Sequence, residues 1–95
     1  MFILLASYKV EVKHQKQFLK ESKAFYVKKF KSAKGFKEVK FLRNIQQPGY
    51  IDVLTSWKTK EDFFNFIKAH QKQGTLKYSI PVEVLERYLY EELKE

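Results

Sequence analysis

The chain has 95 residues, which predicts one domain over residues 1–95, and a domain of this size buries only about two-thirds of its unfolded surface. Its hydrophobic content of 44% and aromatic content of 17% argue against a disordered chain. It contains no cysteine, which excludes disulfides and metal sites built on sulfur ligands. With His14 and His70 as the two histidines, we expect no metal site.

The net charge of +8 raises the question of a polyanionic partner. Seventeen of the nineteen basic residues are lysines, distributed from Lys9 to Lys94, and Arg43 and Arg87 are the two arginines. This distribution favours solvated lysines on the outer faces of helices, so we expect no nucleic acid partner. Richness in lysine and glutamate without cysteine is typical of a thermophile. The apolar opening of residues 1–6 is too short for a secretion signal, and we expect a cytoplasmic protein with no membrane association.

The first half of the chain predicts a strand followed by a helix. Residues 2–12 begin as a continuous apolar run with apolar side chains on both faces and end in alternation, which indicates a strand. Residues 14–33 change to a helical period, with Phe18, Phe25 and Phe30 on one stripe and lysines on the other side. Gly35 stands where a helix commonly ends in a left-handed residue.

The second half predicts two strands, a helix and a long last strand. Residues 36–45 and 50–57 alternate around a turn with Pro48 and Gly49, which indicates an antiparallel hairpin. Thr59 starts a helix with a capping box, and its inner face carries Phe63, Phe66, Ile67 and His70. Residues 82–93 are the last strand, expected to place Val84, Tyr88 and Tyr90 on one face and Leu85, Leu89 and Leu93 on the other.

The order β-α-β-β-α-β predicts an α+β, ferredoxin-like domain with a four-stranded antiparallel sheet and two helices on one face. The other face of this sheet remains partly apolar, and no further element of the chain is left to cover it. We therefore expect a homodimer through the sheet faces, in which a second copy supplies the cover.

Residues 50–71, YIDVLTSWKTKEDFFNFIKAHQ, resemble the central motif of the antibiotic biosynthesis monooxygenase family, in which a strand ends in Trp and a capped turn leads to a Phe-rich helix and a His. The matching positions are Trp57, Thr59, Glu61, Asp62, Phe63, Phe66 and His70, and Lys34-Gly35-Phe36 also resembles the start of the family's second strand. The resemblance implies a dimeric α+β barrel with a pocket between the sheet and the helices of each protomer.

The resemblance implies several activities, because the family includes cofactor-independent monooxygenases, haem-degrading enzymes and proteins of unknown role. Haem-degrading members use an Asn on the first strand, a Trp on the second helix and a His ligand to iron. Here the first strand has Leu5-Ala6-Ser7, the helix has Phe66, and His70 stands earlier than that ligand, so haem binding is disfavoured. We expect instead a monooxygenase without a cofactor that acts on an aromatic or other apolar small molecule.

Two other functions stay open. The same fold can serve as a non-catalytic small-ligand-binding domain or as a structural dimer. RNA recognition motifs share the order of elements, but the first and third strands here lack the basic, glycine-bearing pattern of those motifs.

Candidate site residues follow from side-chain chemistry. His70 could act as a general base, or cap the end of its helix; Trp57 could donate its N–H to a substrate oxygen, or belong to the core. The expected substrate-binding residues are Phe63, Phe66, Tyr26, Ser7, Asn44 and Arg43, with Tyr8 as a further polar group near the same cavity.

Overall fold

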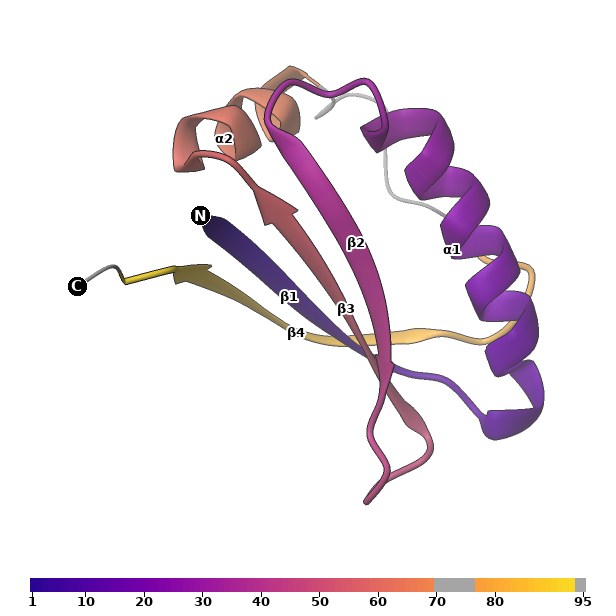
Figure 1. The fold of residues 1–95 in the computed structure, drawn as a ribbon. Coiled ribbons are helices and arrows are strands. Elements are labelled where there is room, and N and C mark those ends of the chain that lie inside the picture. Colours follow the sequence, from indigo (N-terminus) through magenta and orange to yellow (C-terminus); the bar gives the residue numbers. More distant parts are fainter. Residues whose placement is uncertain (70–76, 94–95) are drawn as a thin grey trace.

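The computed structural model describes residues 1–69 and 77–93 and has the predicted order of elements (Figure 1). These are β1 (Phe2–Lys9), the short 3-10 helix η1 (Val12–His14), α1 (Gln15–Phe30), β2 (Phe36–Arg43), β3 (Tyr50–Trp57), α2 (Lys60–Ala69) and β4 (Glu83–Glu91). None of the helices in the described residues is long and apolar enough to span a membrane.

The strands form one antiparallel sheet in the order β2-β3-β1-β4. Both helices lie on the same face of this sheet. The ring of Phe18 in α1 is 5.5 Å from that of Tyr8, and the ring of Phe63 in α2 is 5.2 Å from that of Phe2. Tyr8 and Phe2 are an even number of residues apart on β1, so they point to the same side. The ferredoxin-like α+β prediction is confirmed.

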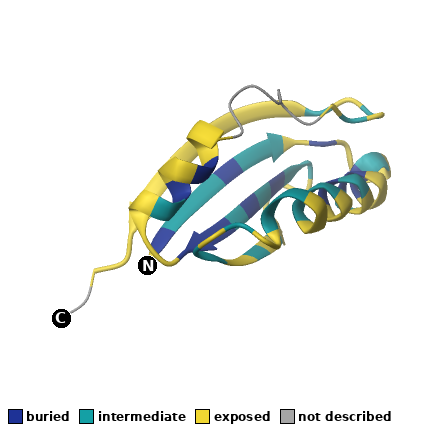
Figure 2. Cartoon of the chain, turned by 90° about the horizontal axis from the view of Figure 1, so that it is seen from above, coloured by how far each residue is buried: buried dark blue, intermediate teal, exposed yellow. Residues whose placement is uncertain are grey.

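The core has two clusters, one under each helix. Phe2, Trp57, Phe63 and Phe66 pack under α2, and a second cluster under α1 consists of Val10, Phe18, Ile51 and Val53. Alternate residues of β3 are buried, as predicted from their period of two, and Figure 2 shows buried positions alternating along the inner strands.

Several predicted ends were wrong by a few residues. The first strand stops at Lys9 because residues 12–14 form a 3-10 turn, closed by a bond from the His14 amide to the Glu11 carbonyl (2.8 Å). The first helix ends at Phe30 and not at residue 33. The second strand ends at Arg43 because the Asn44 Oδ1 accepts the amides of Gln46 and Gln47 and forms a turn.

Of two predicted helix end signals, the cap at Thr59 is confirmed and the glycine at position 35 marks a different boundary. The Thr59 Oγ1 accepts the amide of Asp62 (3.1 Å) and caps α2. Gly35 has the expected left-handed φ of 81°, but α1 ends five residues earlier, so this glycine forms the turn directly before β2 and does not end the helix.

The last strand contains an irregularity that the sequence pattern did not predict. Its register shifts between Ser7 and Tyr8 of β1, so that Glu86 pairs with Ser7 and Val84 pairs with Tyr8, leaving one extra residue between them. Tyr88 and Tyr90 therefore face away from the helices, as the partners of Leu5 and Ile3, whereas Val84 lies on the helix side. The prediction that Val84 shares a face with the two tyrosines was wrong, because the bulge reverses the alternation.

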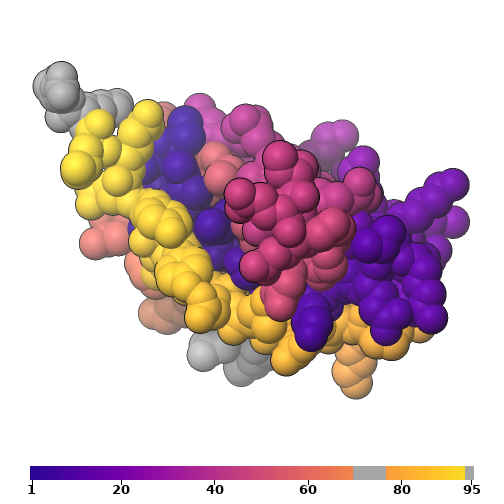
Figure 3. Space-filling view, turned by 90° about the horizontal axis from the view of Figure 1, so that it is seen from below, coloured from indigo at the N-terminus to yellow at the C-terminus, as the bar shows by residue number. Residues whose placement is uncertain are grey.

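The sheet face opposite the helices is partly apolar and is not covered by the rest of the described chain. The register places Ile3, Leu5, Leu42, Leu54, Tyr88 and Tyr90 on it, and we call these residues the open face. Leu42, Tyr88 and Tyr90 are between 43% and 48% exposed. Figure 3 shows β4, in orange to yellow, exposed along one side of the molecule.

Candidate functional site

Trp57 lies at the centre of an aromatic cluster between the sheet and α2. Its side chain is fully buried, and its ring centroid lies 5.3 Å from that of Phe66, 5.4 Å from that of Phe36 and 5.6 Å from that of Phe63. Its Nε1 donates to the Thr55 Oγ1 at 3.4 Å, so the polar atom also has a partner inside the protein. The structure therefore brings Trp57, Phe63 and Phe66 together as a packed core.

The predicted base, His70, lies outside the described residues, one position beyond the last residue of α2. Phe63 and Phe66 of α2 are 6% and 9% exposed.

Three other candidates lie away from this cluster. Ser7 is on the open side of the sheet, where its Oγ donates to the Asp52 Oδ1 at 2.7 Å. The Nε of Arg43 donates to the Gln15 Oε1 at 2.9 Å, at the hairpin end of the sheet. Asn44 forms the adjoining turn and is exposed. The structure does not bring Ser7, Arg43 or Asn44 near Trp57.

Tyr26 belongs to a group of hydroxyl side chains between α1 and the sheet. Its side chain is hydrogen-bonded to that of Tyr8, and the charge of Arg87 on β4 lies close enough to act on both hydroxyls. The Tyr78 hydroxyl lies 2.7 Å from that of Ser22, and its ring stacks on Phe18 at 4.9 Å. We call Tyr8, Tyr26, Tyr78, Ser22 and Arg87 the tyrosine cluster.

Burial controls the ionisation of the three tyrosines. Removal from water raises the pKa of Tyr8 and of Tyr26 above the usual value, and the nearby Arg87 opposes part of this effect. Burial also raises the pKa of Tyr78, to about 12. At neutral pH all three are therefore neutral and can donate hydrogen bonds. Neutral donors beside a guanidinium favour an oxygen anion placed among them.

Half-exposed apolar side chains of β4 and α2 also lie on the helix side of the sheet. Leu89 pairs with Leu4 next to the pair of Arg87 and Ala6, and its side chain is 51% exposed. On α2, Phe64 is 47% exposed and Ile67 is 44% exposed, and the ring of Phe64 lies 6.0 Å from that of Phe2. Leu89 thus lies two residues from Arg87 on the same face of β4, whereas Phe64 lies near Phe2, six residues along β1 from Tyr8.

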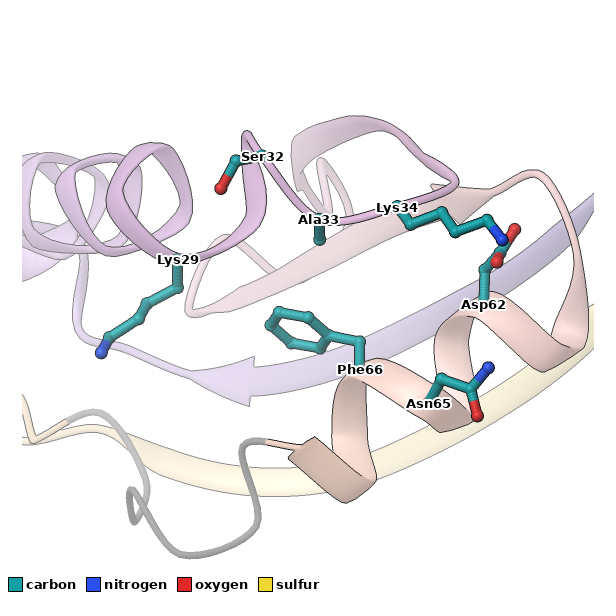
Figure 4. A pocket seen from close by; sticks show the side chains of 7 residues that line it. All are labelled: Lys29, Ser32, Ala33, Lys34, Asp62, Asn65 and Phe66. Carbon is teal, nitrogen blue, oxygen red and sulfur yellow. The ribbon is translucent and has the colours of Figure 1, made fainter.

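Two hollows lie elsewhere, between the end of α1 and the start of α2. One of about 290 Å³ is shown in Figure 4, where the side chain of Lys34 extends toward Asp62; its lining is Lys29, Ser32, Ala33, Lys34, Asp62, Asn65 and Phe66. A neighbouring one of about 490 Å³ shares Lys34, Asp62 and Asn65. Charged side chains of both signs line these hollows, which makes them less suited to an apolar ligand than the surface beside Arg87.

Sequence reasoning missed Arg87, Tyr78 and Ser22. Arg87 is one of two arginines in a chain rich in lysine, and that scarcity was the available signal. Tyr78 precedes β4 in a segment without a regular period, so no pattern placed it against α1. In the described part of the chain, no three His, Asp or Glu side chains gather in a way that could hold a metal ion.

The sequence matches no protein-family model and no curated protein. The fold, however, is similar to that of several solved structures. A proposed antibiotic biosynthesis monooxygenase from Deinococcus radiodurans is 13% identical with a TM-score of 0.67, over 100% of this chain and 95% of that one. A conserved protein from Methanosarcina mazei is 12% identical with a TM-score of 0.66, over 97% and 92%.

The haem degrader MhuD from Mycobacterium tuberculosis, solved with two haems in its active site, is 17% identical with a TM-score of 0.65, over 100% of this chain and 98% of that one. Identities this low show the fold and not the activity. The chain thus has the β-α-β-β-α-β fold of the antibiotic biosynthesis monooxygenase and MhuD structures.

Proposed function

We propose that the chain is a small oxygenase of the antibiotic biosynthesis monooxygenase type, which oxidises an aromatic molecule without a bound cofactor. The observation that carries this proposal is the group of Tyr8, Tyr26 and Arg87 on the helix side of the sheet, with the half-exposed Leu89 two residues from Arg87 on the same face of β4. The likeness in fold to the Deinococcus radiodurans protein supports it, as does the motif of residues 50–71.

The substrate class follows from the chemistry of the site. An electron-rich hydroxyaromatic compound with an acidic ring CH₂ group loses a proton to give an anion whose charge lies largely on oxygen. Arg87 attracts that oxygen, and the Tyr8 or Tyr26 hydroxyl donates to it. The anion then reduces O₂: one oxygen atom forms a carbonyl at the former CH₂ carbon, and the other leaves as water with the two hydrogens. The substrate itself supplies all the electrons, so no further reductant is needed.

The test is oxygen uptake by the purified protein with anthrone-type and quinol-type compounds. We expect Arg87→Met to lower kcat/KM by about 10²-fold, as for removal of one group that stabilises an oxyanion. Lys60→Met is the matched control, because it removes an exposed cation from the start of α2 and should leave the rate unchanged. His70→Ala tests the predicted base and should lower kcat at neutral pH.

Failure of this proposal would be visible in either of two ways. If no compound that binds leads to oxygen consumption, the protein is not an oxygenase. Equal rates for Arg87→Met and Lys60→Met rule out the tyrosine cluster as the site.

A second candidate is a non-catalytic ligand-binding or structural domain, and the dense packing around Trp57 favours it. In this case the space between α2 and the sheet is filled by the protein's own rings. Isothermal titration under argon and in air separates the two candidates, because a binding domain gives the same heat in both and forms no product.

We also propose that the protein is a homodimer whose protomers pack through their open faces. Support comes from the half-exposed side chains of Tyr88, Tyr90 and Leu42 and from the absence of any covering element in the described chain. Tyr88→Lys should shift the mass measured by light scattering from dimer to monomer. Ile45→Lys is the control, because Ile45 is 90% exposed and lies in the hairpin. A wild-type protein of monomer mass would refute the dimer.

A further inference from the structure

The positive charge of the chain lies in one continuous part of it. Residues 15–43 contain ten basic and two acidic residues, a net charge of +8, whereas the rest of the chain contains nine of each and is neutral. This part comprises α1, the connection and β2, and α1 contacts β2 at the edge of the sheet. The fold therefore collects the net charge on one side of the molecule, although the lysines are spread along the sequence.

Four lysines form a line along the outer side of α1. Lys16, Lys20, Lys23 and Lys31 are exposed, and steps of three, four and eight residues keep them on one side of a helix. Gln15, Phe18 and Ser22, on the opposite side, are buried against the sheet. At 1.5 Å per residue the line is about 22 Å long. We call these four residues the lysine line.

Among the described residues no ion pair involves the lysine line, although the charge of Lys20 is close enough to Glu21 to help lower the pKa of that carboxylate. The ion pairs found there involve Lys13, Lys40 and the amino terminus. Glu21 is the one acidic residue on α1, and its carboxylate accepts hydrogen bonds from Ser79 and Gln17. The four ammonium groups are thus available to an external anion.

The side chains around the lysine line indicate which anion fits. The apolar side of α1 is buried in the core, and Ala24 and Val27 are the exposed apolar residues beside the lysines, which is too little apolar surface to insert into a membrane. The exposed aromatic rings Phe64, Tyr88 and Tyr90 lie on other elements, so no ring is available here to stack on the bases of a single strand. Lysines act on phosphates as point charges and do not select a base sequence.

We propose that the lysine line is a sequence-independent binding surface for the phosphate backbone of duplex DNA. A duplex carries one phosphate charge per about 1.7 Å of its axis, so a line of about 22 Å passes more phosphates than its four ammonium groups can neutralise. This surface is separate from the tyrosine cluster, and it revises the expectation of no nucleic acid partner.

The salt dependence of binding tests the proposal. Four neutralised phosphates predict a slope of about −3.6 for log K against log salt, which is an affinity loss of about 100-fold between roughly 50 and 200 mM salt. The assay is fluorescence anisotropy of a labelled duplex of arbitrary sequence, repeated with a second, unrelated sequence. Both duplexes should give the same affinity and slope.

A matched pair of variants separates the lysine line from net charge alone. The test variant carries Lys16→Gln, Lys20→Gln, Lys23→Gln and Lys31→Gln. The control carries Lys9→Gln, Lys58→Gln, Lys60→Gln and Lys68→Gln, four exposed lysines elsewhere, and has the same net charge. At about 50 mM salt, the test variant should lose at least ten-fold in affinity and most of its salt slope, while the control should stay within about three-fold of the wild type.

Four results would overturn the proposal. They are equal losses in the two variants, no binding of the wild type at low salt, tighter binding of single-stranded DNA than of the duplex, and binding to vesicles of anionic lipid without binding to DNA. Circular dichroism of both variants establishes that they are folded before the affinities are compared.

Discussion

The side chain of Gln15 joins the start of α1 to the β2–β3 hairpin and carries the sharpest stability prediction. It is 1% exposed. Its Nε2 donates to the carbonyls of Val10 (3.0 Å) and Pro48 (2.5 Å), and its Oε1 accepts the Nε of Arg43 (2.9 Å). We expect Gln15→Met, which keeps the volume and removes all three bonds, to destabilise the protein.

The size of the effect follows from what the substitution leaves unpaired. A neutral hydrogen bond contributes about 1 kcal/mol and a charge-assisted one about 1.5–3 kcal/mol. Arg43 and Pro48 are exposed and can bond to water instead, but Val10 is 1% exposed and its carbonyl has no such replacement. We therefore expect a loss of about 2–4 kcal/mol in the free energy of unfolding.

Urea unfolding followed by circular dichroism measures this loss as a shift of the midpoint at constant slope. Gln17→Met is the matched control, two residues along the same helix, because Gln17 is exposed and bonds only to the exposed carboxylate of Glu21. A midpoint for Gln15→Met that equals that of Gln17→Met would refute the reasoning, because the buried amide would then contribute nothing.

Three further predictions concern single groups. Gly35→Ala should cost about 1–3 kcal/mol in the free energy of unfolding, because residue 35 has a positive φ and the new methyl group meets the side chain of Asp62. Adding Asp62→Ala should recover only part of the contact cost, because the Cβ of residue 62 still lies 2.6 Å from the new methyl group; urea unfolding measures both effects. The stability that arises from the raised pKa of Tyr78 is fully present below about pH 10 and is lost as the pH rises through about 12. In an ultraviolet titration of tyrosinate, Tyr78→Phe should remove one step near pH 12. Hydrogen bonds from Ser79 and Gln17 lower the pKa of Glu21, so the stability that this carboxylate contributes is present above about pH 4.3 and is lost as the pH falls through the lowered pKa. The unfolding midpoint of Glu21→Gln should therefore depend less on pH in this acidic range than that of the wild type. An unchanged acid dependence would contradict the prediction.

The fold was predictable because local patterns agreed with one another. The alternation in residues 50–57, the Thr59 cap and Gly35 each indicated a boundary or a buried face, and each is present in the structure. The ends of β1 and β2 depend on local hydrogen bonds that the sequence pattern did not reveal. The turn made by the Asn44 side chain and the bulge opposite Tyr8 depend on pairings that a period of two does not contain.

The candidate site was less predictable, because it depends on contacts between elements distant in sequence. The structure brings Trp57, Phe63 and Phe66 together as predicted, but their rings pack against one another as core and do not line a pocket together. Ser7 differs from Ala6 and Tyr8 by one position on β1, which already places it on the opposite face of the sheet from them. Arg87 reaches Tyr8 and Tyr26 only through the pairing of the first strand with the last.

That pairing also determines the order in which the chain can fold. β1 lies between β3 and β4, and Phe2 pairs with Glu91. β1 therefore cannot complete its pairing until β4, the last strand of the sheet, has been synthesised. The β2–β3 hairpin, joined by a short turn, closes its loop at a much lower entropic cost and is expected to form first. On the ribosome, β1 can pair with β3 on one edge, while its other edge stays open until β4 has emerged.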